Sequence, residues 1–247
     1  MNPHAPPLSI IQRSVLRCLP ELGLPSGAKV LDAPCGDGAL SHALAQAGFE
    51  VQASDLQPPA SPLPGPFTGA DFNQTLPWPD SSFDAVFSLE GIEHLENRFF
   101  FLREVNRILR PGGTLVLTTP NISSLRSRVR FLGSGFYHRD SRPLNEARRQ
   151  PLHHIGLGTF ADWRYALHTS GFSLARAGAT HAKLISYPYA VFAPWMYIYT
   201  LLAFRKEKDA AQRERNRTIR RTLFSRALLF GENLLLVALA HNKQKEI

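Results

Sequence analysis

Apolar positions recur along this chain in two patterns, one typical of buried strands and one typical of helices. Short apolar runs predict seven strands, near residues 30–32, 48–55, 67–71, 85–88, 114–119, 172–177 and 232–240. Apolar residues three and four positions apart predict helices over 8–19, 39–47 and 97–109, and a further helix begins after Thr159 and stops at Gly171. Because strands and helices alternate, the pattern predicts a doubly wound α/β fold on a mostly parallel sheet.

The first strand–turn–helix unit organises the rest of the chain. Asp32 stands at the carboxyl end of the first strand, and a turn with Gly36 and Gly38 leads into the helix. Doubly wound sheets bind ligands at this edge, where glycine backbones and helix N-termini converge. The dinucleotide fingerprint G-x-G-x-x-G does not fit, because its three positions hold Pro34, Gly36 and Ala39. The remaining pattern, taken alone, also fits an ordinary strand-to-helix turn.

The order acidic-x-x-x-Gly-x-Gly resembles motif I of the class I S-adenosylmethionine (SAM) methyltransferases. SAM carries an ammonium that needs hydrogen-bond acceptors and a sulfonium that needs close backbone approach. Gly36 and Gly38 allow that approach because they lack Cβ. Pro34 replaces the family's usual glycine, which we interpret as a rigid variant of the turn. We assign Asp32, Pro34, Gly36 and Gly38 to the cofactor site.

A second acid follows the second strand. Asp55 lies 23 residues after Asp32, where an acid in a βαβ unit accepts hydrogen bonds from ribose hydroxyls. The alternative is an acid that merely sits in a solvated loop. Leu56, directly after Asp55, and Leu89, beyond the fourth strand, complete this side of the predicted cofactor site.

The third strand follows a proline-rich connection over residues 56–66 and leads to Asp71. In the family that the chain resembles, an acid here meets the adenine amino group, so Asp71 and the backbone of Phe72 are the matching candidates. The stretches 76–84 and 104–118 also resemble that family, and the resemblance covers about residues 28–120. It implies a sheet order of 3-2-1-4-5-7-6 with an antiparallel last strand, and in-line transfer of the methyl group.

An acidic cluster follows the fourth strand. If Glu90-Gly-Ile-Glu-His94 is helical, Glu90, Glu93 and His94 share one face. His94 then serves as a general base toward an acceptor hydroxyl, or the three side chains hold a divalent metal that lowers the pKa of that hydroxyl. The pattern Glu-x-x-Glu-His resembles that of ubiquinone-pathway O-methyltransferases, where it is associated with a metal. A purely structural histidine is the third reading.

Two further features lie on the acceptor side. In related methyltransferases a His-Ile pair precedes the helix near the acceptor, so His154 is a secondary catalytic candidate, with a core or capping role as the alternative. Residues 123–150 are rich in arginine, which suits phosphate or carboxylate ligands but also suits a solvated loop. These arginines are Arg126, Arg128, Arg130, Arg139, Arg142, Arg148 and Arg149.

The largest departure from the family is an insertion over residues 182–230, before the last strand. It begins with an apolar, aromatic run at 187–204 and continues with a basic helical run. This pairing predicts a segment that lies in an anionic membrane interface. Two internal prolines and the need to return to the sheet argue against a membrane span. A lid over the site and a face between two subunits are the alternatives.

Composition agrees with one α/β domain over 1–247 in a reducing compartment. The chain carries a net charge of +8 and two cysteines, Cys18 and Cys35, with no disulfide or zinc pattern. The N-terminus lacks the pattern of a signal peptide. We therefore expect a cytoplasmic enzyme, peripheral on the inner membrane face, acting on a small-molecule or lipid-like acceptor. A homo-oligomer is compatible with the sequence.

The predicted reaction is methylation of a hydroxyl on a lipid-linked, quinone-like or glycolipid-like molecule. The basic charge and the arginine–aromatic interleaving also suit a nucleic-acid methyltransferase. Against that alternative, the place of an Asn-Pro-Pro-Tyr-type motif holds Ser88-Leu-Glu-Gly. A third alternative is a non-catalytic SAM-binding or membrane scaffold, and the cluster of Glu90, Glu93 and His94 argues against it.

Overall fold

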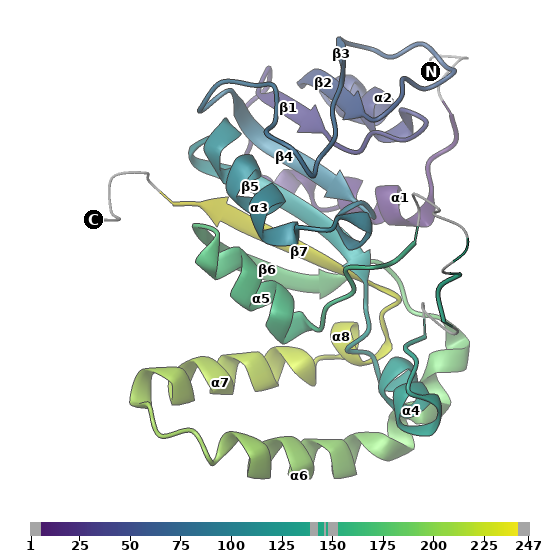
Figure 1. Ribbon diagram of the computed structural model, residues 1–247, viewed down its shortest axis with the longest axis vertical. Coiled ribbons are helices and arrows are strands. Elements are labelled where there is room, and N and C mark those ends of the chain that lie inside the picture. Colours follow the sequence, from purple (N-terminus) through teal and green to yellow (C-terminus); the bar gives the residue numbers. More distant parts are fainter. Residues whose placement is uncertain (1–5, 139–142, 146, 148–152, 242–247) are drawn as a thin grey trace.

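The computed structural model describes residues 6–138, 143–145, 147 and 153–241. Its centre is a seven-stranded sheet in the order β3-β2-β1-β4-β5-β7-β6, and β7 runs antiparallel to β5 and β6 (Figure 1). The predicted strand order and antiparallel last strand are therefore confirmed. The strands are β1 (Lys29–Asp32), β2 (Glu50–Asp55), β3 (Phe67–Gly69), β4 (Phe83–Leu89), β5 (Leu109–Pro120), β6 (Phe172–Ala179) and β7 (Asn233–Ala240).

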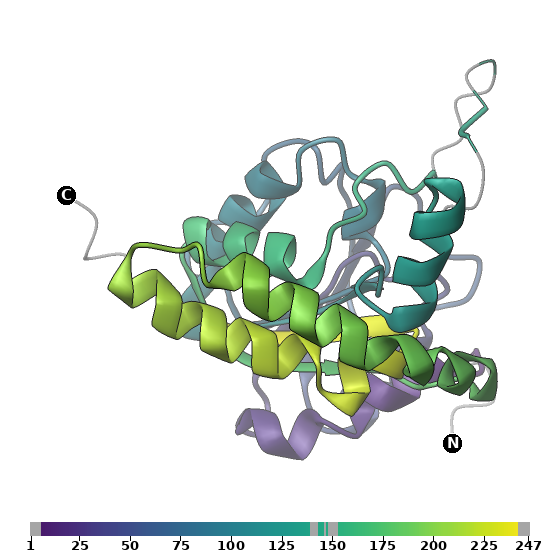
Figure 2. The same ribbon diagram turned by 90° about the horizontal axis from the view of Figure 1, so that it is seen from below.

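Alternation along the strands separates two apolar layers. Val30 and Leu31 are neighbours in β1 but belong to opposite layers, as do Val116 and Leu115 in β5. On the layer of Leu31 lie α3 (Arg98–Ile108) and α5 (Phe160–Thr169), and on the other lie α1 (Ile10–Leu16) and α2 (Ala39–Gln46) (Figure 2). Each fully buried aliphatic side chain contributes about 1.5–3 kcal/mol to this packing.

The N-terminal helix is shorter than the predicted 8–19. Ser9 accepts a hydrogen bond from the backbone of Gln12, so the helix begins at Ile10. Pro20 has no N–H to continue the helix, and the chain passes instead into the short 3₁₀ helix η1 (Leu19–Leu22).

Residues 110–113, which lie between the predicted helix 97–109 and the predicted strand 114–119, are part of a strand. α3 ends at Ile108, and β5 begins at once at Leu109. Phe83 pairs with Leu109 while Ala85 pairs with Thr114, so the residues between bulge out of the register. Gly112 has a φ of 78°, a left-handed value that glycine adopts without strain. The glycines thus shape a bulge inside β5.

The insertion between β6 and β7 is helical. It consists of η3 (Leu184–Phe192), α6 (Ala193–Phe204), α7 (Ala210–Leu223) and α8 (Arg226–Phe230). Figures 1 and 2 show α6 and α7 as an antiparallel hairpin beyond the β6 side of the sheet. Tyr197 packs edge-on against Phe224, with ring centroids 5.0 Å apart. None of the helices in the described part of the chain has both the length and the apolar character that a membrane crossing requires.

A further helix lies in the arginine-rich segment. α4 (Leu125–Ser134) begins after Ser124, whose side chain accepts from the Ser127 N–H, and it ends at Gly135, where φ is 71°. It carries Arg126, Arg128 and Arg130. Arg139, Arg142, Arg148 and Arg149 lie outside the described residues.

Candidate functional site

The glycine turn lies at the carboxyl edge of the sheet, between β1 and α2. Gly36 and Gly38 have φ values of 53° and 84°, so the turn needs residues without a Cβ. Asp37 Oδ1 accepts from the Ala39 N–H at 3.0 Å and secures the start of α2. Cys35 is buried beneath the turn, and this burial raises the pKa of its thiol to about 12. The thiol is therefore protonated and structural.

The ends of β1 and β2 meet through the second predicted acid. The Gly36 N–H donates to Asp55 Oδ2 at 3.0 Å, and the Leu56 N–H donates to Asp55 Oδ1 at 2.7 Å. Asp55 is half-buried and Leu56 is exposed. Asp55, which the sequence assigned to the cofactor site from its position in the βαβ unit, thus lies in contact with the glycine turn.

Asp32 is almost fully buried below the same turn. Ser41, on the first turn of α2, donates through its hydroxyl to Asp32 Oδ2 at 2.6 Å. Burial raises the pKa of Asp32 to about 7, and the charges of Asp55 and Asp37 add to this rise. The site thus holds a carboxyl group that titrates near neutral pH. The partner, Ser41, was not predicted, because a serine on an otherwise apolar helix face gives no distinctive signal.

Two other cofactor candidates follow β3. Asp71 accepts hydrogen bonds from the Asn73 N–H at 2.9 Å and from Gln74 Nε2 at 3.2 Å, which orients its carboxylate. Phe72 is buried and packs against Phe101, with ring centroids 5.7 Å apart. The Phe72 side chain therefore belongs to the core, and the role of its backbone toward the adenine stays a prediction.

The segment after β4 differs from the predicted helix. Only Ile92–His94 forms a short 3₁₀ helix, η2, and Glu90 before it has a φ of 50°. The Glu90 N–H donates to the Thr118 carbonyl oxygen at 3.1 Å, and the Glu90 carboxylate accepts from Asn233 Nδ2. Glu90 therefore faces β7, and the predicted shared face of Glu90, Glu93 and His94 is wrong. The positive φ turns the chain before a helical face can form.

A different group of three forms instead, from Glu93, His94 and His154. One potential ligand atom from each residue lies within 4.8 Å of the others. The rings of His94 and His154 have centroids 5.0 Å apart, and Gly156 N–H donates to the Glu93 carbonyl oxygen at 2.8 Å. The segment before α5 is thus anchored onto η2. His154, the secondary candidate of the sequence, joins the group at this place.

The hydrogen bond of His94 defines which ring nitrogen carries its proton. His94 Nδ1 lies 3.0 Å from the carbonyl oxygen of His153, which can only accept. Neutral His94 therefore carries its proton on Nδ1, and Nε2 keeps a lone pair. Such a nitrogen can accept a proton from a hydroxyl or coordinate a metal. Two imidazoles and a carboxylate are also a suitable donor set for a divalent transition metal.

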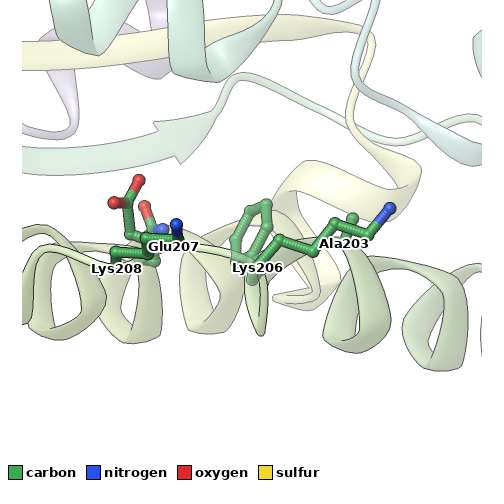
Figure 3. A pocket seen from close by; sticks show the side chains of 6 residues that line it. Ala203, Lys206, Glu207 and Lys208 are labelled. Atoms are coloured by element: carbon green, nitrogen blue, oxygen red, sulfur yellow. The ribbon is translucent and has the colours of Figure 1, made fainter.

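Leu89 ends β4 at the same edge, and Pro34 lies half-buried between the glycine turn and η2. The sheet edge thus carries the cofactor candidates over β1, β2 and β3, and the Glu93–His94–His154 group beyond β4. A hollow of about 490 Å³ lies elsewhere, at the turn between α6 and α7 (Figure 3). It is lined by Ala203, Phe204, Lys206, Glu207, Lys208 and Asn216, and by none of the candidate site residues.

Residues 31–117 match the family described as "Methyltransferase domain". The chain is 37% identical over 107 residues to the 2-methyl-6-phytyl-1,4-hydroquinone methyltransferase of Synechocystis sp., covering 40% of this chain and 34% of that protein. It is 32% identical over 123 residues to the ubiquinone biosynthesis O-methyltransferase of Xanthomonas campestris, covering 46% of this chain and 52% of that protein. The matches thus span a third to a half of these relatives.

The fold is also found among solved structures. A SAM dependent methyltransferase from Archaeoglobus fulgidus aligns with a TM-score of 0.54 at 17% identity, covering 92% of this chain and 94% of that one. At this identity the alignment supports the fold alone. The matched domain confirms the predicted methyltransferase resemblance over residues 31–117, and it implies SAM as the cofactor.

Proposed function

We propose that this chain, which carries a methyltransferase domain over residues 31–117, transfers a methyl group from SAM to a hydroxyl of a lipid-like acceptor. One observation carries the proposal. The Gly36–Asp55 contact and the Glu93–His94–His154 group occupy one edge of one sheet. SAM bound at the glycine turn, as the methyl donor, and a proton-accepting side chain can therefore face each other across β1 and β4, where ligands of such sheets bind.

The cofactor half is assigned as follows. Asp32 provides negative charge for the ammonium of SAM, and Gly36 and Gly38 allow the backbone to approach its sulfonium. Asp55 accepts hydrogen bonds from the ribose hydroxyls. Asp71 and the backbone of Phe72 meet the adenine. Pro34, Leu56 and Leu89 provide contact surface at the ends of β1, β2 and β4.

In the acceptor half, His94 Nε2 accepts the hydroxyl proton as the methyl group arrives. The bond from Nδ1 to the His153 carbonyl oxygen supports this role because it leaves Nε2 unprotonated. His154 and Glu93 position the acceptor and stabilise the imidazolium that forms. No step needs a redox partner, because the hydroxyl oxygen accepts the methyl group and His94 accepts the proton.

Metal assistance is the second candidate for the same group. The donors in this case would be Glu93, His94 and His154, whose potential ligand atoms lie within 4.8 Å of one another, in place of the set with Glu90 that the sequence left open as an alternative. A bound divalent cation would lower the pKa of an acceptor hydroxyl. Glu90 follows β4, and its carboxylate accepts from Asn233 of β7, so we assign it a structural role in either case.

The quinone-like class of acceptor is supported by the printed names of the two relatives, which are a hydroquinone methyltransferase and a ubiquinone biosynthesis enzyme. An anionic membrane surface is supported by the insertion. Its η3 and α6 expose large apolar side chains, and the neighbouring α7 is basic. These side chains are Leu184, Ile185, Val191, Phe192, Trp195, Tyr197, Ile198, Tyr199 and Leu202. We therefore place the enzyme peripherally on such a surface.

Titration calorimetry with SAM, followed by a methyl-transfer screen against extracted lipids and quinones, tests the proposal. Saturable SAM binding and transfer to one of these extracts are the expected results. Absence of SAM binding by a folded sample would refute the cofactor assignment. SAM binding with transfer to an oligonucleotide and none to the extracts would instead favour nucleic acid as the acceptor.

A further inference from the structure

Three basic side chains converge on the buried carboxylate of Glu232. Lys183 Nζ lies 3.2 Å from Glu232 Oε2, His138 Nε2 lies 3.5 Å from the same oxygen, and Arg126 Nη1 lies 3.6 Å from Oε1. The three basic side chains come from three places: α4, the segment after it, and the residue before η3. Only 2% of the Glu232 side chain is exposed, whereas half of Lys183 is exposed. The carboxylate of the cluster is thus shielded from solvent, whereas its lysine is accessible to solvent.

Among the described side chains of this cluster, basic groups outnumber carboxylates. The Glu232 carboxylate lies beside two permanent cations and one imidazole, and among the described residues Arg126 and Lys183 form ion pairs with Glu232 alone. Counted over these described side chains, the permanent cations exceed the carboxylate by one. Partly buried surplus charge costs free energy unless an anion or water compensates it. A phosphate group carries about 1.5 to 2 negative charges at neutral pH and matches this surplus.

The cluster is built on a rigid frame. The Glu232 N–H donates to the His181 carbonyl oxygen at 2.8 Å, and the Glu232 carbonyl oxygen accepts from the Asn121 N–H at 3.0 Å. Asn121 Nδ2 also donates to the carbonyl oxygens of Leu228 and Gly231, at 2.8 and 2.9 Å. The backbone position of Glu232, around which the basic side chains gather, is therefore fixed before any ligand binds, which lowers the entropy cost of binding.

The cluster connects on one side to the Glu93–His94–His154 group and on the other to the exposed apolar residues that begin at Leu184. Asn233, the neighbour of Glu232, donates to Glu90, and Glu90 leads into η2 with His94. On the other side, Lys183 is followed directly by Leu184 and Ile185, which are 87% and 59% exposed. An acceptor with a charged head and an apolar chain fits this order of surfaces.

We propose that Arg126, His138 and Lys183 form an anion subsite that binds a phosphate group of the acceptor, with Leu184 and Ile185 contacting an adjoining apolar chain. The inference rests on the proposed function, because it takes the η2 side of the sheet as the acceptor side. It deepens that function by assigning a phosphate to an acceptor that is otherwise described only as lipid-like.

The test is a calorimetric titration of the full chain with inorganic phosphate. We expect saturable binding that weakens about fivefold or more in Arg126→Gln and in Lys183→Gln. Arg103→Gln, which removes an exposed arginine from α3, is the matched control and leaves phosphate binding unchanged. No saturable binding, or equal weakening in the control, overturns the subsite.

Two further arms sharpen the result. Glu232→Gln removes the competing carboxylate, so phosphate binds more tightly if the cluster is an anion site. If this variant does not fold, the result for Lys183→Gln, at a half-exposed position, decides the test.

Monomeric dihexanoyl phosphatidate distinguishes a lipid phosphate from a soluble phosphate. If phosphatidate binds more tightly than inorganic phosphate, and Leu184→Gln removes this difference, the natural ligand is a lipid phosphate. If phosphatidate and inorganic phosphate bind with equal affinity, the natural ligand is a soluble phosphate. SAM titration of the same variants separates this inference from the cofactor assignment, because loss of phosphate binding alone leaves SAM binding intact.

Discussion

The ring of Pro34 lies directly against the backbone of Gly91. A Cβ atom added to Gly91 would come within 2.5 Å of Pro34 Cδ and 2.6 Å of Pro34 Cγ. Pro34 belongs to the predicted cofactor turn, and Gly91 opens the turn that carries Glu93 and His94. The proline that stands where the resembled family has glycine is thus accommodated by a glycine on the acceptor side. The two halves of the site are in van der Waals contact through this pair.

Gly91→Ala therefore forces the two turns apart. We expect a loss of about 1–3 kcal/mol in the free energy of unfolding, typical of an overpacked buried site, and weaker SAM binding. Denaturant unfolding and calorimetry measure the two effects. Gly133→Ala is the control, because that helical glycine has open space around it. Adding Pro34→Gly to Gly91→Ala relieves the clash and restores part of both losses; no recovery in the double variant contradicts the contact.

Asp55 supplies a test of the cofactor assignment. Asp55→Ala removes both the proposed ribose acceptor and the partner of the Gly36 N–H. We expect SAM affinity to fall about tenfold or more, since a charged hydrogen-bond partner is worth roughly 1.5–3 kcal/mol. Glu50→Gln, at the opposite end of β2, is exposed and keeps full affinity. Equal SAM affinity in Asp55→Ala and the parent would place the ribose elsewhere.

Asp32 predicts a pH dependence. Its pKa rises from 3.8 to about 7 in the folded chain, because burial disfavours the carboxylate. The protonated folded state is thus favoured at low pH, and stability falls as pH rises from 3.8 toward 7, by a few kcal/mol in the absence of SAM. Thermal unfolding of the SAM-free protein between pH 5 and pH 8 measures this fall, and Asp32→Asn should flatten it.

Binding of SAM should show the opposite trend. The carboxylate form of Asp32 pairs with the SAM ammonium, so affinity should increase between pH 5.5 and 7.5. Calorimetry at these pH values measures the change, and Asp32→Asn should remove it. If Asp32→Asn keeps the same increase, another group is responsible.

His94 is the proposed base. His94→Gln should lower kcat by about 100-fold or more while the Kd for SAM stays the same, because the substitution affects proton transfer and leaves the glycine turn intact. His168→Gln, exposed near the end of α5, is the control. S-adenosylhomocysteine release measures the rate. Loss of activity on chelation, regained with a divalent cation, would instead favour the metal arrangement of Glu93, His94 and His154.

The parts of the fold that local pattern specifies were predictable. The alternation of strands and helices follows from periodicity, and the glycine turn and Asp55 follow from motifs that are contiguous in the sequence. The strand order followed from the resemblance to a known family, because periodicity does not specify which strands pair. The extent of β5 was not predictable, because proline and glycines at 110–113 signal a break in either a loop or a bulge. Only the pairing of Leu109 with Phe83 distinguishes the two.

The acceptor side shows the limit of spacing rules. Glu90, Glu93 and His94 share a face only if the backbone is helical, and the positive φ of Glu90 prevents that. Its partner Asn233 lies 143 positions away in the sequence, so no local pattern announces the contact. His154 reaches the group through the Gly156 hydrogen bond to Glu93, which is equally non-local. Tertiary contacts, which single-chain periodicity does not encode, decide this half of the site.

The exposed face of α6 predicts binding to anionic vesicles. Ile198 is 56% exposed on that face, and burying its side chain in an interface is worth about 1.5–3 kcal/mol. In a flotation assay with phosphatidylglycerol vesicles, Ile198→Glu should weaken binding about tenfold or more. Tyr165→Glu changes an exposed apolar residue on α5 and serves as the matched control.

Added salt should weaken the remaining attraction, because the arginines of α7 act through screened charge. If the parent protein does not float with these vesicles, the membrane placement is wrong. If Ile198→Glu instead converts a dimer to a monomer in light scattering, the same face joins two subunits. The two outcomes differ in salt response as well, since an apolar subunit contact strengthens or stays constant as salt rises, whereas attraction to anionic lipid declines.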